Sequence, residues 1–93
     1  MILSFEDKDT ECIWNQLPIR RVDRAVQRVA LRKLFMIARA HSQRDLQLVP
    51  GNRFEALRGD RAGQYSIRIN GRWRLCFKWE AGNAYEVEIA DYH

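Results

Sequence analysis

Hydrophobic residues in the first half of the chain recur at helical spacing. Between residues 22 and 41 the apolar positions fall three and four apart, which predicts a long amphipathic helix whose other side is rich in arginine. A shorter helix is expected before it, capped by Asp9 or Thr10 and closed by Pro18. Residues 42–53 contain a Pro-Gly-Asn turn cluster and are interpreted as a connector. The first half therefore predicts two helices.

Apolar and polar residues alternate in the second half, which is the pattern of β-strands. Residues 53–59 form a short candidate strand, while apolar and polar residues alternate regularly over residues 64–70 and 72–80. A last strand is expected over residues 84–90, and residues 1–5 add a short N-terminal strand. Together these elements predict an α+β fold, with two helices packed on a mainly antiparallel sheet that ends in a C-terminal β-meander.

The loop between the two alternating strands decides which side chains share a face of the sheet. A two-residue Asn-Gly loop would pair apolar residues with arginines. A three-residue loop at residues 69–71, with its glycine left-handed, places Arg68 opposite Arg72 and Ser66 opposite Arg74. The hairpin then has one apolar and one cationic face. Because like charges across a ladder lower stability, an anionic ligand explains this clustering better than folding does.

Composition supports one small domain over residues 1–93, since 46% hydrophobic content suffices for a modest core. No apolar run approaches the roughly 18 to 20 residues of a membrane span, and the start lacks a signal-peptide pattern. We therefore expect a cytoplasmic protein with no membrane partner. Cys12 and Cys76 lack the spacing of a disulfide framework or of zinc ligands, so no metal or cofactor is expected.

The net charge of +4 conceals two basic segments. Residues 20–39 carry +6 and residues 53–78 carry +5, whereas residues 1–19 and 79–93 are acidic. This distribution favours a polyanionic partner, nucleic acid before membrane. A solvated surface is the alternative that charge alone leaves open.

The middle segment LRGDRAGQYSIRINGRWRLCFKWE and the closing DYH resemble the RelE/ParE toxin superfamily, and within it the HigB group of plasmid-maintenance killer proteins. The resemblance extends over nearly the whole chain. It implies a RelE-like fold and a ribosome-dependent messenger-RNA endonuclease, an mRNA interferase that inhibits translation. It also implies a HigA-type helix-turn-helix antitoxin that silences the toxin, in a complex that binds operator DNA.

Metal-independent RNA cleavage needs a base for the 2′-hydroxyl, cations for the phosphorane and an acid for the leaving 5′-oxygen. The cationic sheet face offers Arg68 and Arg74 as phosphate clamps, because a guanidinium can bond two phosphate oxygens. Arg72 and Lys78 extend this face, and Arg28 on the long helix is a further candidate for RNA binding. Taken singly, Arg68 or Arg74 is better explained as an ordinary solvated strand residue, whereas the pair together, near a terminal imidazole, favours function.

The family resemblance implies further catalytic residues. Some HigB toxins carry a catalytic histidine just before the Leu-x-Gly-Asp motif; here Glu55 stands at that place and is similar to the general base of the YoeB branch. Asp91, Tyr92 and His93 match the functional terminus of the family. Their implied roles are orientation of the imidazole, stacking on a base, and proton transfer. The alternatives are a surface carboxylate for Glu55 and a frayed terminus for His93.

Two other functions remain open. ParE-like members of the superfamily inhibit DNA gyrase and lack the catalytic set, although the terminal Asp-Tyr-His argues against this branch. A toxin that binds ribosomes or assembly factors and cleaves weakly would carry the same arginines, so charge does not separate it from a nuclease.

Overall fold

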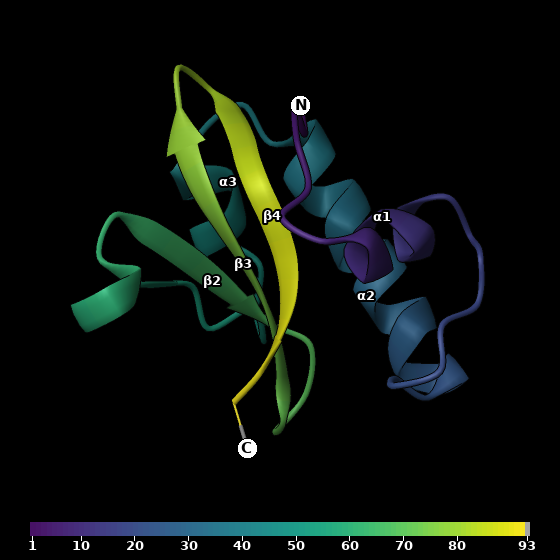
Figure 1. Cartoon of the computed structure of the whole chain (residues 1–93). Coiled ribbons are helices and arrows are strands. Elements are labelled where there is room, and N and C mark those ends of the chain that lie inside the picture. Colours follow the sequence, from purple (N-terminus) through teal and green to yellow (C-terminus); the bar gives the residue numbers. More distant parts are fainter. Residues whose placement is uncertain (93) are drawn as a thin grey trace.

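The computed structural model describes residues 1–92 and shows a four-stranded antiparallel sheet with helices packed against it (Figure 1). The strand order is β1-β2-β3-β4, so each strand pairs with the next one in the chain. The elements are helices α1 (Lys8–Trp14), α2 (Arg24–Arg39) and α3 (Gln43–Gln47), strand β1 (Glu55–Ala56), the 3₁₀ turn η1 (Gly59–Arg61), and strands β2 (Gln64–Arg68), β3 (Trp73–Glu80) and β4 (Asn83–Asp91). The predicted α+β fold with a C-terminal meander is confirmed.

Helix α1 begins at Lys8 because the Asp7 side chain caps it. The Asp7 carboxylate accepts a hydrogen bond from the backbone N–H of Thr10 at 2.8 Å. The predicted cap at Asp9 or Thr10 is therefore wrong. Thr10 is fully buried, and its hydroxyl accepts a hydrogen bond from the backbone N–H of Ile89 at 2.9 Å. This hydroxyl joins α1 to β4 instead of capping the helix.

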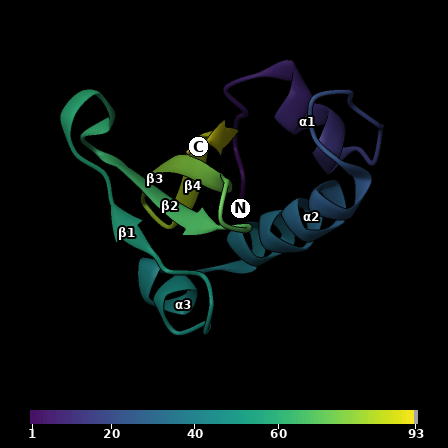
Figure 2. The ribbon, with the colours of Figure 1, turned by 90° about the horizontal axis from the view of Figure 1, so that it is seen from below.

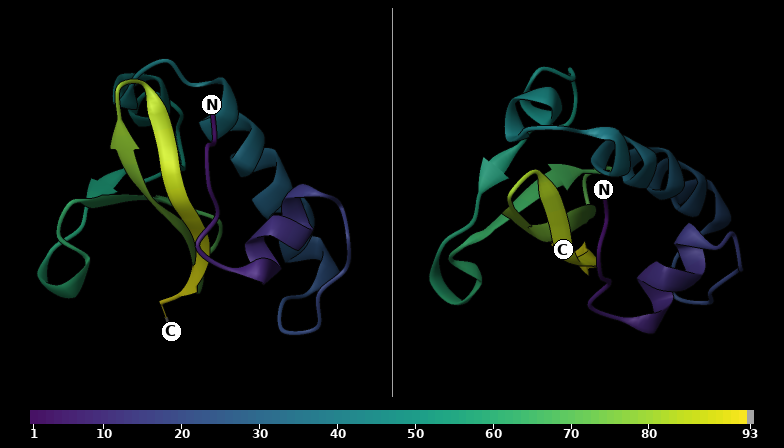
Figure 3. Two further views of the ribbon diagram at one scale, coloured as in Figure 1. Left: turned by 45° about the horizontal axis from the view of Figure 1, so that its top comes forward. Right: turned by 90° about the horizontal axis from the view of Figure 1, so that it is seen from above.

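Residues 1–6 run beside β4 without forming a regular strand (Figure 3). Isolated parallel bridges join Ile2 and Phe5 to β4. Between these bridges β4 is irregular: Glu86 has a φ of +50° and its N–H donates to the Ser4 hydroxyl at 2.8 Å. The irregularity interrupts the ladder, so the predicted N-terminal strand is reduced to two bridges.

Helix α2 is two residues shorter at each end than predicted. Its apolar side lies on the sheet, where Leu34 and Ile37 are fully buried in one cluster with Leu75 and Phe77 of β3. The opposite side carries exposed arginines, as the helical spacing indicates. The helix layer therefore covers one face of the sheet and leaves the other face for polar residues.

The segment predicted to be a connector contains helix α3, which lies beside β1 (Figure 2). Ser42 and Asp45 form a capping box, and the Asp45 carboxylate accepts a hydrogen bond from the Ser42 N–H at 3.2 Å. Leu46 is buried in the core. A capped turn with one buried leucine is sufficient for a short helix here, so the connector prediction is wrong for these residues.

The turn between β2 and β3 comprises residues 70–72, one residue later than the predicted loop. Ile69 donates its N–H to the carbonyl of Trp73 at 2.9 Å and closes the turn. The Asn70 side chain accounts for the shift, because its oxygen accepts hydrogen bonds from the N–H groups of Arg72 and Trp73 at 2.9 and 2.8 Å.

The register changes accordingly. Arg68 lies opposite Arg74 rather than Arg72, and Ser66 lies opposite Cys76. Gly71 does not have a positive φ, so the left-handed glycine prediction is also wrong. The predicted loop and the observed loop both contain three residues, however, so each side chain keeps its predicted face of the sheet. The separation into an apolar and a cationic face is confirmed.

Candidate active site

The polar face of the sheet lies opposite the face covered by α1 and α2. Arg68 of β2 and Arg74 of β3 are direct partners across the ladder, and Ser66 pairs with Cys76 beside them. Glu55 of β1 is in turn the partner of Ser66. Strand pairing therefore brings a carboxylate, a hydroxyl and two guanidinium groups onto one surface.

The Arg74 guanidinium is held in one orientation. Its Nε donates to the Ser66 hydroxyl at 2.8 Å, and its Nη2 donates to the backbone carbonyl of Arg53 at 2.6 Å. The side chain is only 11% exposed. Fixed donors of this kind can stabilise charge that develops in a transition state without reorganisation.

Glu55 supplies an accessible carboxylate next to this guanidinium. Its Oε1 lies 3.8 Å from Arg74 Nε, and its side chain is 54% exposed. Among residues 1–92 the ion pair of Glu55 is with Arg74 of β3, and not with its sequence neighbours Arg53 or Arg58. A solvent-facing carboxylate at this place can accept a proton from a bound hydroxyl.

Arg68 differs from Arg74 in having free donors. Its backbone N–H bonds to the carbonyl of Asn52 at 2.6 Å, and its guanidinium extends toward the β2–β3 turn, near Gly71. Within the described part of the chain, the Arg68 side chain forms no hydrogen bond or ion pair. Its charge is therefore available to an anion.

Tyr92 reaches the same polar face from the end of β4. Its hydroxyl lies 3.6 Å from Cys76 Sγ, and the Arg74 guanidinium carbon lies 5.8 Å from the centre of its ring. Burial and the hydrogen bond with Cys76 raise the pKa of Tyr92 to about 12, so the phenol is protonated near neutral pH. Burial likewise raises the pKa of the Cys76 thiol, which is consistent with a packing role.

Asp91 and Arg72 form an ion pair at the end of the sheet. Arg72 Nε and Nη2 both donate to Asp91 Oδ2, at 3.1 and 2.8 Å, and the Arg72 guanidinium lies over the Trp73 ring. The hydrogen bond with Asp91 raises the pKa of Arg72. The structure thus brings Arg72 to Asp91 rather than to Arg68. His93 lies outside the described residues, so its role remains a prediction from the sequence.

Lys78 lies two residues beyond Cys76, past a bulge in the β3–β4 ladder. It forms an ion pair with Glu86 at 2.6 Å, and this hydrogen bond raises the pKa of Lys78. The structure therefore places Lys78 in a local ion pair at the other end of β3, and its contact with RNA remains a prediction.

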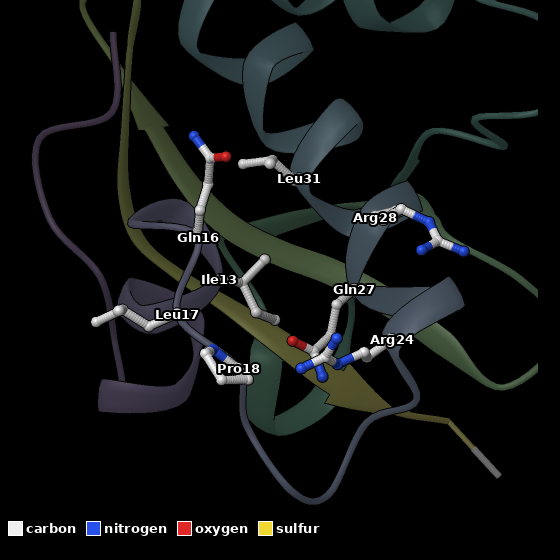
Figure 4. A pocket seen from close by; sticks show the side chains of 8 residues that line it. All are labelled: Ile13, Gln16, Leu17, Pro18, Arg24, Gln27, Arg28 and Leu31. Atoms are coloured by element: carbon white, nitrogen blue, oxygen red, sulfur yellow. The ribbon is translucent and has the colours of Figure 1, made fainter.

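Arg28 belongs to the helix layer. With Arg24 it borders a groove of about 280 Å³ between α1 and α2, lined by the apolar side chains of Ile13, Leu17 and Leu31 (Figure 4). It is exposed, and it lies on the opposite side of the sheet from Arg74. Any contact that it makes with RNA would be part of docking, separate from the cleavage chemistry.

An ion pair at the edge of the polar face was not expected from the sequence. Arg61 of η1 donates to Glu88 of β4 at 2.7 Å and to Gln64 at 3.1 Å. The hydrogen bond with Glu88 raises the pKa of Arg61. The alternation of β4 could have assigned Glu88 to the polar face, but η1 reaches it only through the tertiary fold.

Residues 1–92 contain no group of three or more histidine, cysteine or acidic side chains arranged to hold a metal ion. Over the same residues, no helix has the length and apolar character needed to cross a membrane.

Comparison with known proteins identifies the relatives of this chain. A family model described as "RelE-like toxin of type II toxin-antitoxin system HigB" matches residues 3–93. The chain belongs to this family. Toxin HigB-1 of Vibrio cholerae serotype O1 is 38% identical over 85 residues, which cover 90% of each protein. Endoribonuclease HigB of Proteus vulgaris is 43% identical over 37 residues, 40% of each protein.

The resemblance to HigB toxins is therefore confirmed, and with it the assignment to type II toxin-antitoxin systems. The RelE-like description agrees with the antiparallel sheet and helix layer described above. The polar sheet face of this chain carries Glu55, Arg68, Arg74 and Tyr92.

Proposed function

We propose that this HigB-family toxin is an endoribonuclease that cuts messenger RNA on the ribosome. The observation that carries the proposal is the exposed carboxylate of Glu55 beside the immobilised guanidinium of Arg74. One group can accept a proton and the other can hold a phosphate, and Arg68 adds an uncompensated positive charge opposite Arg74. The relative named Endoribonuclease HigB supports this activity.

The proposed reaction uses the 2′-hydroxyl of the RNA as nucleophile. Glu55 accepts the 2′-hydroxyl proton, the 2′-oxygen bonds to phosphorus, and the bond from phosphorus to the 5′-oxygen breaks. Arg68 and Arg74 stabilise the negative charge of the phosphorane. His93 donates the proton that the leaving 5′-oxygen requires, a role that rests on the match with the family's Asp-Tyr-His. The products are a 2′,3′-cyclic phosphate and a 5′-hydroxyl end.

Tyr92 and Asp91 have supporting roles in this proposal. Tyr92 is 42% exposed and lies on the polar face, and its ring can stack on a base of the bound RNA. Its protonated hydroxyl can donate a hydrogen bond. Asp91, which binds Arg72, is proposed to orient the imidazole of His93.

Ribosome binding is proposed to use the basic outer side of α2. Arg24, Arg28 and Arg32 are exposed and form no ion pair among the residues described, whereas Arg21 pairs with Asp9 at 2.6 Å. Uncompensated charges bind polyanions more strongly than paired ones, and ribosomal RNA is such a partner. Arg72 and Lys78 are proposed as weaker contacts, because each already has an acidic partner.

A HigA-type helix-turn-helix antitoxin is proposed as the protein partner, in a cytoplasmic complex that also binds operator DNA. Membership of a type II toxin-antitoxin family supports an antitoxin. Co-expression with the product of the neighbouring gene tests it: restored growth and co-purification are expected. Growth arrest that persists, with no complex formed, would contradict the partner.

Mapping 5′ ends of cellular RNA after brief induction tests the nuclease. We expect new 5′-hydroxyl ends aligned with codons, because the ribosome presents the message in register. The alternative toxin, which binds ribosomes or assembly factors with weak cleavage, predicts unchanged message ends and accumulated ribosome precursors. A ParE-like gyrase inhibitor predicts DNA damage with intact messages, and the HigB family match argues against it.

A further inference from the structure

Asn52 is a fully buried amide that connects three elements of the fold. Its Oδ1 accepts a hydrogen bond from Lys33 Nζ of α2 at 2.5 Å, and its Nδ2 donates to the carbonyl of Leu46 in α3 at 3.1 Å. Its backbone carbonyl accepts the N–H of Arg68 in β2 at 2.6 Å. A single residue in a loop therefore joins two helices to the strand that carries a proposed active-site arginine.

Lys33 is the unusual partner in this arrangement. It is 6% exposed, and among the described residues it forms no ion pair with a carboxylate. Burial, with the nearby charges of Arg32 and Arg68, lowers the pKa of Lys33. An apolar side chain would fill the same space in the core at lower cost, so stability alone does not explain a lysine here.

The residue after Asn52 connects this arrangement to the second arginine. Arg53 has a φ of +45°, a left-handed conformation that is strained for a residue with a side chain. In this conformation its carbonyl accepts the Arg74 Nη2 hydrogen bond at 2.6 Å. The carbonyls of Asn52 and Arg53 thus bind the Arg68 backbone and the Arg74 guanidinium, respectively.

We propose that Asn52, anchored by Lys33, is a positioning residue that sets the direction of the Arg74 guanidinium through the carbonyl of Arg53. The inference rests on the proposed nuclease function and extends it to residues that touch no substrate. Released from Lys33 and Leu46, the loop would relax the strained Arg53, and Arg74 would lose its hydrogen bond to the Arg53 carbonyl. A displacement of about 1 Å at a reacting group lowers rates by about 100-fold.

A double-mutant cycle tests this role. In single-turnover cleavage of ribosome-bound message, Asn52→Ala should lower the rate by about 30-fold or more, with ribosome affinity changed less than about 3-fold. In an Arg74→Ala background the same substitution should lower the rate by less than about 3-fold, because the group that it positions is gone. Equal losses in both backgrounds, or no loss in wild type, would overturn the inference.

Thr10→Val provides the matched control. Thr10 is also fully buried and also binds a backbone group across the fold, on β4. It should lower the melting temperature while leaving the cleavage rate unchanged well below that temperature. If Asn52→Ala does not fold, Lys33→Met is put through the same cycle with the same criteria, since it fills similar volume and removes the anchoring ammonium.

Wild-type protein in the same assay distinguishes failure of the proposed nuclease function from failure of the positioning role of Asn52. Absence of cleavage by wild type would contradict the nuclease itself. Cleavage by wild type with additive effects of Asn52→Ala and Arg74→Ala would contradict only the positioning role.

Discussion

Arg68 and Arg74 face each other directly across the β2–β3 ladder. Arg74 is bound to Ser66 and to the carbonyl of Arg53, whereas the Arg68 guanidinium has no such partner within residues 1–92. Like charges in direct cross-strand pairs destabilise a sheet, so folding does not favour this pair. An anion bound near the two arginines would offset the repulsion.

Arg68→Ala should therefore separate stability from activity. We expect a melting temperature that is unchanged or slightly raised, because a repulsive pair is removed, and a cleavage rate about 100-fold or more lower, because the phosphorane loses one charge. Thermal melts and single-turnover cleavage measure the two effects. Cleavage near the wild-type rate would exclude Arg68 from the mechanism.

Glu55→Gln tests the proposed base. Glutamine keeps the shape and hydrogen bonding of the side chain but does not accept the 2′-hydroxyl proton, so the rate should fall by about 100-fold or more. Glu80→Gln is the control, because Glu80 is an exposed strand carboxylate at the far end of β3. The Glu80→Gln protein should cleave RNA at the wild-type rate. Normal cleavage by Glu55→Gln would instead show that Glu55 is a surface carboxylate with no role in catalysis.

Tyr92→Phe tests the environment of the phenol through pH. Because the folded pKa of Tyr92 is raised to about 12, the fold favours the protonated phenol. This contribution is fully present below the ordinary tyrosine pKa of about 10 and is lost as pH rises through about 12. Wild-type melting temperature should therefore fall more steeply than that of Tyr92→Phe between about pH 10 and 12. Parallel curves would contradict a partly buried, Cys76-bound hydroxyl.

Alternation along β2 and β3 predicted which residues share a face, because side-chain direction follows the strand period of two. It did not predict that Arg74, rather than Arg72, opposes Arg68. The deciding interaction is local but irregular: the Asn70 oxygen caps two N–H groups and moves the loop by one residue. Turn chemistry of this kind is not visible in hydrophobic patterning.

The Lys33–Asn52 contact could not be predicted for a different reason. On a helical projection Lys33 belongs to the arginine-rich segment and is expected to be solvated. Its burial depends on where α3 and the following loop pack, and the segment that contains them was expected to be a connector without structure of its own. Long-range polar contacts become visible only once the tertiary fold is known.

Ribosome docking by α2 can be tested with a matched pair of arginines. Arg28 and Arg21 are both exposed, but Arg21 is compensated by Asp7 and Asp9, whereas Arg28 borders the α1–α2 groove without an acidic partner among the described residues. If Arg28 contacts a ribosomal phosphate, Arg28→Ala should weaken binding at low salt and reduce the slope of log K against log[salt] by about 0.7 to 1.

Arg21→Ala should change the slope much less, because its charge is already neutralised. Equilibrium binding to purified ribosomes over a range of salt concentrations measures both variants. Unchanged binding of Arg28→Ala at every salt concentration would contradict the RNA contact. Loss of antitoxin binding by the same variant would then indicate that the apolar groove and its two arginines bind an acidic protein segment. A phosphate backbone has no apolar surface that could pack against Leu17 and Leu31.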